Sequence, residues 1–286
     1  MEAPRTVTVF TRRNPSQTAV ALKRVVELAN EAGVEVRVLD EELAKHGLSE
    51  GDHGIRRLDE PGDGTDLALA LGGDGTILTT LRRYAGRGVP VFAVNYGAIG
   101  FLASVEQSEL EEGVRRALRG DFEVLALPAL TATTAQGDHL AVNDISFHRL
   151  QEGRVAELAY SVRGEELGQV RCDGLVVSTA AGSTGYNLAN GGPVLAWGVA
   201  GYVVSFIAPH TLTARALVVA PDDLMEVTNR SKEEPVEMTT DGRAVCRVAP
   251  GETVTIRFEE GRALLAQMPG ATFYHRLRDK FGRLAY

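Results

Sequence analysis

Hydrophobic positions in the first third of the chain follow two periods, one typical of buried strands and one typical of amphipathic helices. Apolar runs of strand length lie at residues 5–10, 34–39, 67–71 and 89–94. Between them, residues 15–28 and 76–84 place apolar side chains at helical spacing, and Gly33 stands where the first helix should end. Residues 40–66 are polar and are interpreted as a surface excursion. Strands alternating with helices predict a parallel, Rossmann-like α/β sheet.

The pattern changes after residue 121 to short β-rich segments separated by turn residues. These segments lie at residues 130–134, 141–147, 155–162, 175–179, 202–207, 225–228, 236–239 and 253–258. Many short strands at such spacing predict an antiparallel β-sandwich.

Two further helices mark the limits of this β-rich part. The sequence Ser108-Glu-Leu-Glu111 has the form of a capping box that opens a helix, and residues 272–281 have the pattern of a short amphipathic helix. We therefore expect an α/β domain over residues 1–120 and an all-β sandwich over residues 121–270. The tail, residues 271–286, is expected to pack back on the first domain.

Charge and composition limit the classes of partner. The chain has 286 residues, a formal net charge of -8 and a pI near 5.4, which argues against an extended nucleic-acid or anionic-membrane surface. Two cysteines, Cys172 and Cys246, form neither a disulfide framework nor a metal cluster and suggest a reducing compartment. No signal-peptide pattern occurs, and no apolar run approaches the ~20 residues of a membrane helix. We expect a cytoplasmic protein without a membrane partner.

The strongest chemical signal is the turn Gly72-Gly-Asp-Gly-Thr76, which follows a strand and precedes a helix. Glycines that can adopt positive φ leave main-chain N–H groups open to a phosphate, and a helix N-terminus adds partial positive charge. Asp74 would repel that phosphate unless it binds Mg²⁺ or accepts a proton from an attacking hydroxyl. Both roles are those of a kinase, although such a turn alone is also compatible with a tight structural connection.

Two constellations in the second half point to a nucleotide. Another strand ends in the turn Gly182-Ser-Thr-Gly185, and Tyr186 and Asn187 follow it, where a ring and its polar edge can be bound. Asn143 and Asp144 form a pair that can bind vicinal ribose hydroxyls, or a polar pair in an edge turn. Each constellation taken alone leaves the structural and the functional interpretation open.

Taken together, these motifs resemble the NAD kinase family over nearly the whole chain. The turn at residues 72–76 also resembles lipid and sphingosine kinases, but residues 173–193 are similar to NAD kinases specifically. The resemblance implies an α/β domain, a β-sandwich and a homodimer or homotetramer. It also implies phosphoryl transfer from ATP or polyphosphate to the 2′-hydroxyl of the adenosine ribose of NAD, with Mg²⁺ or a similar divalent cation.

The resemblance assigns roles to individual residues. Asp74 takes the position of the catalytic aspartate, and the phosphate-donor loop comprises Gly72, Gly73, Gly75 and Thr76. Contacts with NAD are implied at Asp74, Gly75, Asn143, Asp144, Arg154, Arg171, Asp173, Thr184, Gly185, Tyr186, Asn187, Leu188, Ala189, Ala208 and Arg243.

The chain departs from the family pattern at several of these positions. Asp144 stands where the family usually has Glu, so its carboxylate is one methylene shorter and a looser ribose contact is expected. Ala180 and Ala181 replace a proline and a threonine, and Gly185 replaces an alanine, which predicts a more flexible loop. Residues 95–101 resemble the second glycine turn of the family, in which Ala98 replaces a basic residue.

Three alternatives remain open at this point. A lipid or sphingoid kinase would share the first glycine turn, and a non-catalytic NAD-sensing module would bind NAD without turnover. A serine hydrolase would use Ser183, followed by Asp222 or Asp241 and His275, but the first glycine of a nucleophile elbow is missing.

Overall fold

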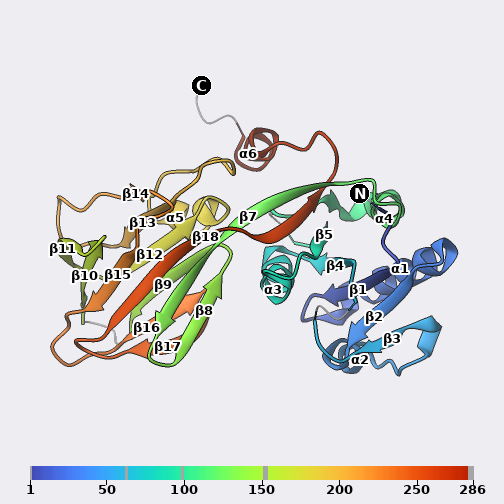
Figure 1. Cartoon of the computed structure of the whole chain (residues 1–286), viewed down its shortest axis with the longest axis horizontal. Coiled ribbons are helices and arrows are strands. Elements are labelled where there is room, and N and C mark those ends of the chain that lie inside the picture. Colours follow the sequence, from blue (N-terminus) through green and yellow to red (C-terminus); the bar gives the residue numbers. More distant parts are fainter. Residues whose placement is uncertain (1, 62–63, 98–99, 151–153, 283–286) are drawn as a thin grey trace. The chain divides into compact units, whose positions relative to one another are not determined.

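The chain forms two compact units in the computed structural model (Figure 1). The model describes residues 2–61, 64–97, 100–150 and 154–282. Unit 1 comprises Met1–Ala126 and Ala263–Tyr286, and unit 2 comprises Leu127–Arg262. The predicted domain limits at residues 120 and 270 stay a prediction, and residues 283–286 of the predicted tail lie outside the described residues.

Unit 1 contains a parallel sheet, as the alternation of strands and helices predicts. Its strands are β1 (Thr6–Thr11), β2 (Glu35–Leu39), β3 (Arg56–Leu58), β4 (Leu67–Gly72), β5 (Pro90–Asn95) and β6 (Val105–Glu106). They run in the order β5-β4-β1-β2-β3, with β6 and the end of β18 (Thr253–Gln267) beside β5, and all these pairs are parallel. Every residue of β1, β4 and β5 is buried, which explains their continuous apolar runs.

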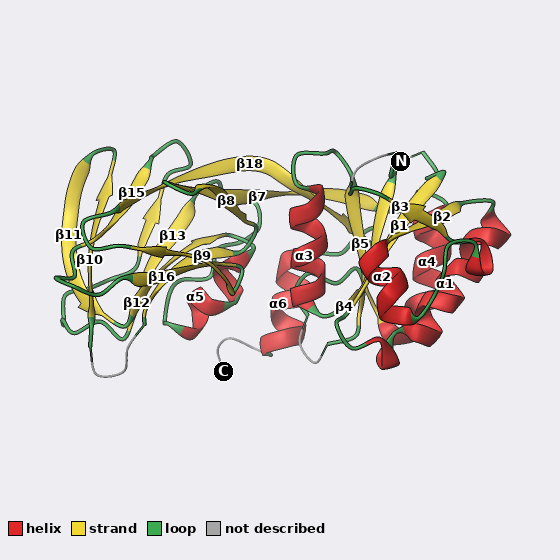
Figure 2. Cartoon of the chain, turned by 90° about the horizontal axis from the view of Figure 1, so that it is seen from below, coloured by secondary structure: helices red, strands yellow, loops and turns green. Residues whose placement is uncertain are grey.

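Helices complete unit 1. They are α1 (Ala19–Ala32), α2 (Asp40–His46), α3 (Asp74–Tyr84), α4 (Leu110–Leu118) and α6 (Phe273–Phe281), with 3₁₀ turns at Pro15–Gln17, Asp52–Gly54 and Gln107–Glu109. Helices α1 and α4 lie side by side and share one apolar core with the strands (Figure 2). Gly33 ends α1 in the left-handed conformation, with φ of 69°, as predicted.

Two predictions for unit 1 are wrong. The stretch 40–66 is not only a surface excursion, because it contains α2 and β3. The capping box is formed by Glu106 and Glu109 before α4, not by Ser108 and Glu111. Helix α2 and strand β3 carry too few buried apolar positions to produce a periodic signal. Helix α2 buries only Leu43 and Glu42.

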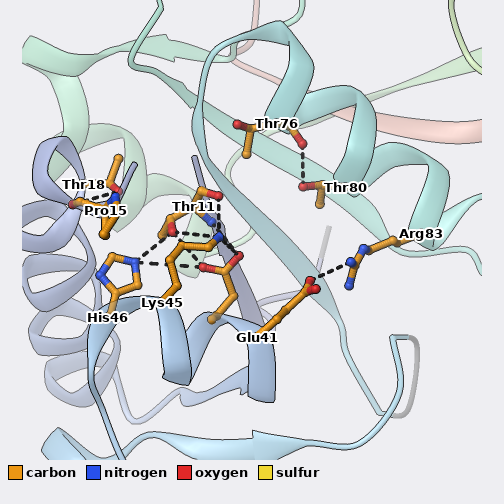
Figure 3. Close-up of polar contacts among 10 residues, drawn as sticks. Thr11, Pro15, Thr18, Glu41, Lys45, His46, Thr76, Thr80 and Arg83 are labelled. Carbon is orange, nitrogen blue, oxygen red and sulfur yellow. Dashed lines mark hydrogen bonds and ion pairs between the residues drawn. The ribbon is translucent and has the colours of Figure 1, made fainter. Parts of the chain in front are cut away.

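Polar contacts replace the missing apolar face of α2 (Figure 3). The Thr11 hydroxyl, at the end of β1, donates to Glu42 Oε2 at 2.7 Å and lies 2.8 Å from His46 Nε2. Lys45 Nζ donates to the Thr11 carbonyl oxygen at 3.0 Å and to Glu42 Oε1 at 2.6 Å. Burial lowers the pKa of His46. This network fixes α2 on the carboxyl end of β1.

Antiparallel strands form the sheets of unit 2 and enclose an apolar core, which confirms the predicted antiparallel β architecture. One sheet has the order β14-β13-β12-β9-β16-β17, and a second group has the order β11-β10-β15-β18, with β7 and β8 paired as a hairpin. The core takes side chains from both groups. The strands are β7 (Glu123–Thr134), β8 (Gly137–Ala141), β9 (Asp144–Arg149), β10 (Ala156–Val162), β11 (Glu165–Cys172), β12 (Gly174–Thr179), β13 (Tyr202–Ile207), β14 (Leu217–Val219), β15 (Met225–Asn229), β16 (Val236–Thr240) and β17 (Arg243–Val248).

The strands that sequence analysis missed share one property. Strands β3, β11, β14 and β17 end their sheet orders, and among the described residues β6 pairs only with β5 and β8 only with β7. An edge strand buries fewer side chains, and β11 and β17 keep most of theirs at least partly exposed. Weak apolar alternation is the result. Among the described residues, no helix has the length and apolar character needed to cross a membrane.

Candidate active site

The first glycine turn lies at the carboxyl end of β4, where ligands of parallel sheets bind. Helix α3 begins at Asp74, two residues earlier than predicted, so the carboxylate belongs to the first helical turn. The expectation of positive φ is wrong for Gly72, Gly73 and Gly75. Close packing explains instead why glycine stands at two of these positions. A Cβ on Gly72 would lie 2.3 Å from Thr76 Oγ1, and one on Gly73 would lie 3.3 Å from Gly97 Cα.

The Asp74 carboxylate is oriented by two main-chain amides. The Phe101 N–H donates to Oδ2 at 3.1 Å, and the Leu102 N–H donates to Oδ1 at 3.4 Å. Burial raises the pKa of Asp74, and the two amides and the charges of Lys280 and Arg276 oppose that rise. The carboxylate is therefore fixed in direction and partly shielded from water.

The second glycine turn packs directly on the first. Asn95 Oδ1 accepts a hydrogen bond from the Gly97 N–H at 2.9 Å, and Asn95 Nδ2 donates to Glu106 Oε2 at 2.8 Å. A Cβ on Gly97 would lie 3.1 Å from Gly73 Cα. Ala98, where a basic residue of the family is replaced, lies outside the described residues.

In unit 2, the predicted Asn143–Asp144 pair is organised by Asp241. The strand predicted over residues 141–147 contains both residues, but β9 begins at Asp144, so Asn143 precedes the observed strand. The Asp241 carboxylate accepts hydrogen bonds from the N–H groups of Val142 (3.2 Å), Asn143 (2.7 Å) and Asp144 (3.2 Å). Burial and the negative charge of Asp241 raise the pKa of Asp144 to about 7.

The loop after β12 packs against the main chain of Asn143. Ala180 and Ala181 are buried, residues Gly182–Thr184 form a 3₁₀ turn, and α5 (Tyr186–Ala189) follows. A Cβ on Gly182 would lie 2.2 Å from the Asn143 carbonyl oxygen, so only glycine permits this approach. The Asn187 Nδ2 group braces the loop by donating to the Ser183 and Pro193 carbonyl oxygens at 3.0 and 2.9 Å.

We expect Gly182→Ala to destabilise the protein by at least about 2 kcal/mol, because the methyl group forces the loop away from Asn143. Equilibrium unfolding in urea measures this loss. Gly198→Ala is the matched control in unit 2, since a Cβ at Gly198 meets no atom within 4 Å. Equal stability of the two variants would contradict the packing argument.

Tyr186 projects from α5 with one face covered. Its ring stacks on His148 with a centroid separation of 5.7 Å and an interplanar angle of 22°. His148 Nε2 lies 2.8 Å from the Ser146 hydroxyl. Sequence analysis missed His148, although the polar residues Asp144, Ser146 and His148 alternate along β9 and so share one side of the strand.

Further predicted contact residues lie around the ends of β11, β12 and β13. Asp173 forms an ion pair with Arg149, at 2.7 Å between Oδ1 and Nε, and its N–H donates to the Ile207 carbonyl oxygen at 2.9 Å, next to Ala208. Sequence analysis missed Arg149. Arg154 and Arg171 line an open groove of about 610 Å³ together with residues 231–234. Arg243 begins β17, directly after the turn that contains Asp241.

The hydrolase alternative is not supported by the surroundings of Ser183. This residue is fully buried, and its hydroxyl donates to the Ala180 carbonyl oxygen at 2.8 Å and accepts from the Leu195 N–H at 2.9 Å. A nucleophile must be accessible to its substrate. Ser183 therefore has a structural role in the loop.

Comparison with known proteins decides the family. The model of the ATP-NAD kinase N-terminal domain matches residues 7–122, and that of the C-terminal domain matches residues 142–267. The chain belongs to the NAD kinase family. It is 38% identical over 225 residues to the NAD kinase of Gemmatimonas aurantiaca, which covers 76% of this chain and 77% of that protein. It is 31% identical over 283 residues to the NAD kinase of Citrifermentans bemidjiense, with 96% and 97% covered.

Solved structures of an NADH kinase and of an NAD kinase share this fold. A crystal structure of yeast NADH kinase complexed with NADH superposes with a TM-score of 0.87 at 20% identity, covering 99% of this chain and 89% of that one. An NAD kinase from Archaeoglobus fulgidus in complex with ATP gives a TM-score of 0.72 at 24% identity, with 97% of both chains covered. The predicted family, the two-part fold and the assignment as a phosphotransferase are thus confirmed.

Proposed function

We propose that this NAD kinase transfers the γ-phosphoryl group of ATP to the 2′-hydroxyl of the adenosine ribose of NAD, with Asp74 as the catalytic residue. The observation that carries the proposal is the Asp74 carboxylate in the first turn of α3, directed by the Phe101 and Leu102 amides. A helix N-terminus after a glycine turn favours bound phosphate, and the carboxylate beside it supplies a proton acceptor.

Asp74 acts during the transfer and not before it. The ordinary pKa of an aspartate carboxyl, 3.8, is far below that of a ribose hydroxyl, and burial raises the pKa of Asp74 toward it. In a loose phosphoryl transition state the attacking oxygen becomes acidic late, so the carboxylate first orients the hydroxyl and then accepts its proton. The new O–P bond forms as the bond between the γ-phosphorus and the bridging oxygen breaks.

Most of the proposed contacts with NAD are made by residues of unit 2. Asn143 and Asp144 would bind ribose hydroxyls, since the Asp241 turn already fixes the main chain of both. Tyr186 would cover the adenine with the face that His148 leaves open. The remaining proposed contacts are Gly75, Arg154, Arg171, Asp173, Thr184, Gly185, Asn187, Leu188, Ala189, Ala208 and Arg243.

A divalent cation fits this chemistry without a dedicated protein cage. Among the described residues, no group of three or more His, Cys, Asp or Glu side chains is placed to bind a metal. Mg²⁺ is commonly bound by one or two carboxylates together with substrate phosphates and water. Substrate phosphates and water would supply the ligands here, because both Asp74 oxygens accept main-chain hydrogen bonds and the carboxylate serves as proton acceptor. The cation would neutralise charge on the transferred phosphoryl group.

The direct test is NADP formation by the purified chain. We expect NADP from NAD, Mg²⁺ and ATP, detected with a coupled NADP-dependent dehydrogenase, and no NADP once EDTA removes the cation. A parallel reaction with polyphosphate in place of ATP shows whether polyphosphate also serves as phosphoryl donor. Binding of NAD without NADP formation from either donor would replace this proposal with the NAD-sensing module. Assembly as a homodimer or homotetramer and a cytoplasmic location stay predictions.

A further inference from the structure

Helix α6 forms hydrogen bonds and ring contacts with residues 101–103, the segment whose N–H groups orient Asp74. Arg276 Nη1 donates to the Phe101 carbonyl oxygen at 3.0 Å and also to that of Ala103, while Nη2 donates to Gln267 Oε1. The Phe101 ring contacts two rings of the same helix, with centroid separations of 6.4 Å to Phe273 and 5.4 Å to Phe281. One planar guanidinium thus fixes three acceptors of unit 1 at once.

A single peptide group connects Arg276 with Asp74. The peptide between Phe101 and Leu102 accepts a hydrogen bond from Arg276 at its carbonyl oxygen and donates one to Asp74 Oδ1 from its N–H. Hydrogen bonds in series polarise one another, so a cation at the carbonyl end strengthens donation at the N–H end. The same guanidinium also acts on Asp74 through its charge.

Lys280, one turn further along α6, makes a second connection. Its Nζ lies 3.1 Å from Glu106 Oε1, and Glu106 Oε2 accepts the Asn95 amide that orders the second glycine turn. Among the described residues, the charged groups that face Asp74 are Arg276 and Lys280 of α6, with Glu106 of β6 paired to Lys280.

We propose that Arg276 is a positioning residue for phosphoryl transfer, which aligns the Asp74 carboxylate through the Phe101–Leu102 peptide. This inference rests on the proposed role of Asp74. It makes the C-terminal helix part of the catalytic apparatus, because Arg276 acts on Asp74 through the peptide between Phe101 and Leu102.

Steady-state kinetics of Arg276→Gln in the full chain provide the test. We expect kcat to fall about 10- to 100-fold while KM for NAD changes less than about twofold, because alignment of Asp74 and not ground-state binding is lost. Loss of the positive charge also removes an effect that lowers the pKa of Asp74, so the acidic limb of the kcat profile moves toward higher pH.

Two further variants separate charge from geometry. Arg276→Lys retains the charge but not the planar fork, so we expect a lowered kcat with the acidic limb at its wild-type position. Arg278→Gln is the matched control, because Arg278 lies on the same helix, is exposed and contacts only His275 and Asp279 in the described part of the chain. Its kcat and pH profile should equal those of the wild type.

A ¹³C NMR titration of the Asp74 carboxyl follows the same change without turnover. A higher Asp74 pKa in Arg276→Gln than in Arg276→Lys supports the inference even if the wild type forms no NADP, which would overturn only the proposed function. An active wild type with an unchanged kcat and acidic limb in Arg276→Gln overturns the inference. Lowered thermal stability with an unmoved acidic limb in that variant also overturns it, because the role is then only structural.

Discussion

Asp74→Asn is expected to reduce turnover at least about 100-fold while NAD still binds, because a general base contributes about 10²- to 10⁴-fold to catalysis. The asparagine has nearly the shape of the aspartate but cannot accept the hydroxyl proton. Its NH₂ group also faces one of the two amides that now donate to the carboxylate, so only one of the Phe101 and Leu102 hydrogen bonds survives. Coupled measurement of NADP gives kcat, and calorimetry with NAD gives the affinity.

Asp66→Asn is the matched control for this variant. Asp66 precedes β4 as Asp74 follows it, and its Oδ2 accepts hydrogen bonds from the N–H groups of Arg5 and Thr6 at 2.8 and 3.0 Å. Asp66→Asn therefore removes a carboxylate that also accepts two main-chain N–H groups, at the opposite end of the strand, where no phosphate chemistry is proposed. Both of these N–H groups donate to one oxygen, so the asparagine carbonyl can keep both hydrogen bonds. Turnover of Asp74→Asn within about tenfold of Asp66→Asn would remove Asp74 from the role of base.

Buried strands and amphipathic helices could be predicted from the sequence because their burial is periodic. Strands β1, β4 and β5 are wholly buried, and α3 buries Ile77, Leu78 and Leu81 on one side. Helix α2 could not be predicted, because it is fixed by Glu42, Lys45 and a threonine about 30 residues away in sequence. Polar networks of this kind have no period.

The candidate site shows the same division. Motifs carried by contiguous residues, such as residues 72–76 and 182–187, could be found in the sequence together with the family they resemble. The partners that orient these motifs are distant in sequence. The Asp241 carboxylate accepts hydrogen bonds from main-chain N–H groups about 100 positions earlier. Arg276 donates a hydrogen bond to the Phe101 carbonyl oxygen, 175 positions away in the sequence. Pairs at such separations leave no local pattern, so their roles become visible only in the folded chain.

Asp144→Asn is expected to stabilise the protein at neutral and alkaline pH and to weaken NAD binding at the same time. The pKa of Asp144 is about 7 in the folded chain, against an ordinary value of 3.8. Between these values the folded state retains a proton that the unfolded state has lost, so this group lowers the free energy of unfolding as pH rises through that window. Each unit of pKa difference corresponds to about 1.4 kcal/mol, and removal of the charge should restore about 2–4 kcal/mol near pH 8.

The difference in unfolding free energy between Asp144→Asn and the wild type should therefore grow from about pH 4 to about pH 7 and then level off. Urea unfolding across this range measures it, and Asp222→Asn is the control, because Asp222 is exposed and its substitution should change stability by less than about 0.5 kcal/mol. KM for NAD should rise about tenfold in Asp144→Asn, since the ribose loses a charged acceptor. A stability difference that does not depend on pH would show that Asp144 carries no buried charge, and its contact with the ribose would then need no ionised carboxylate.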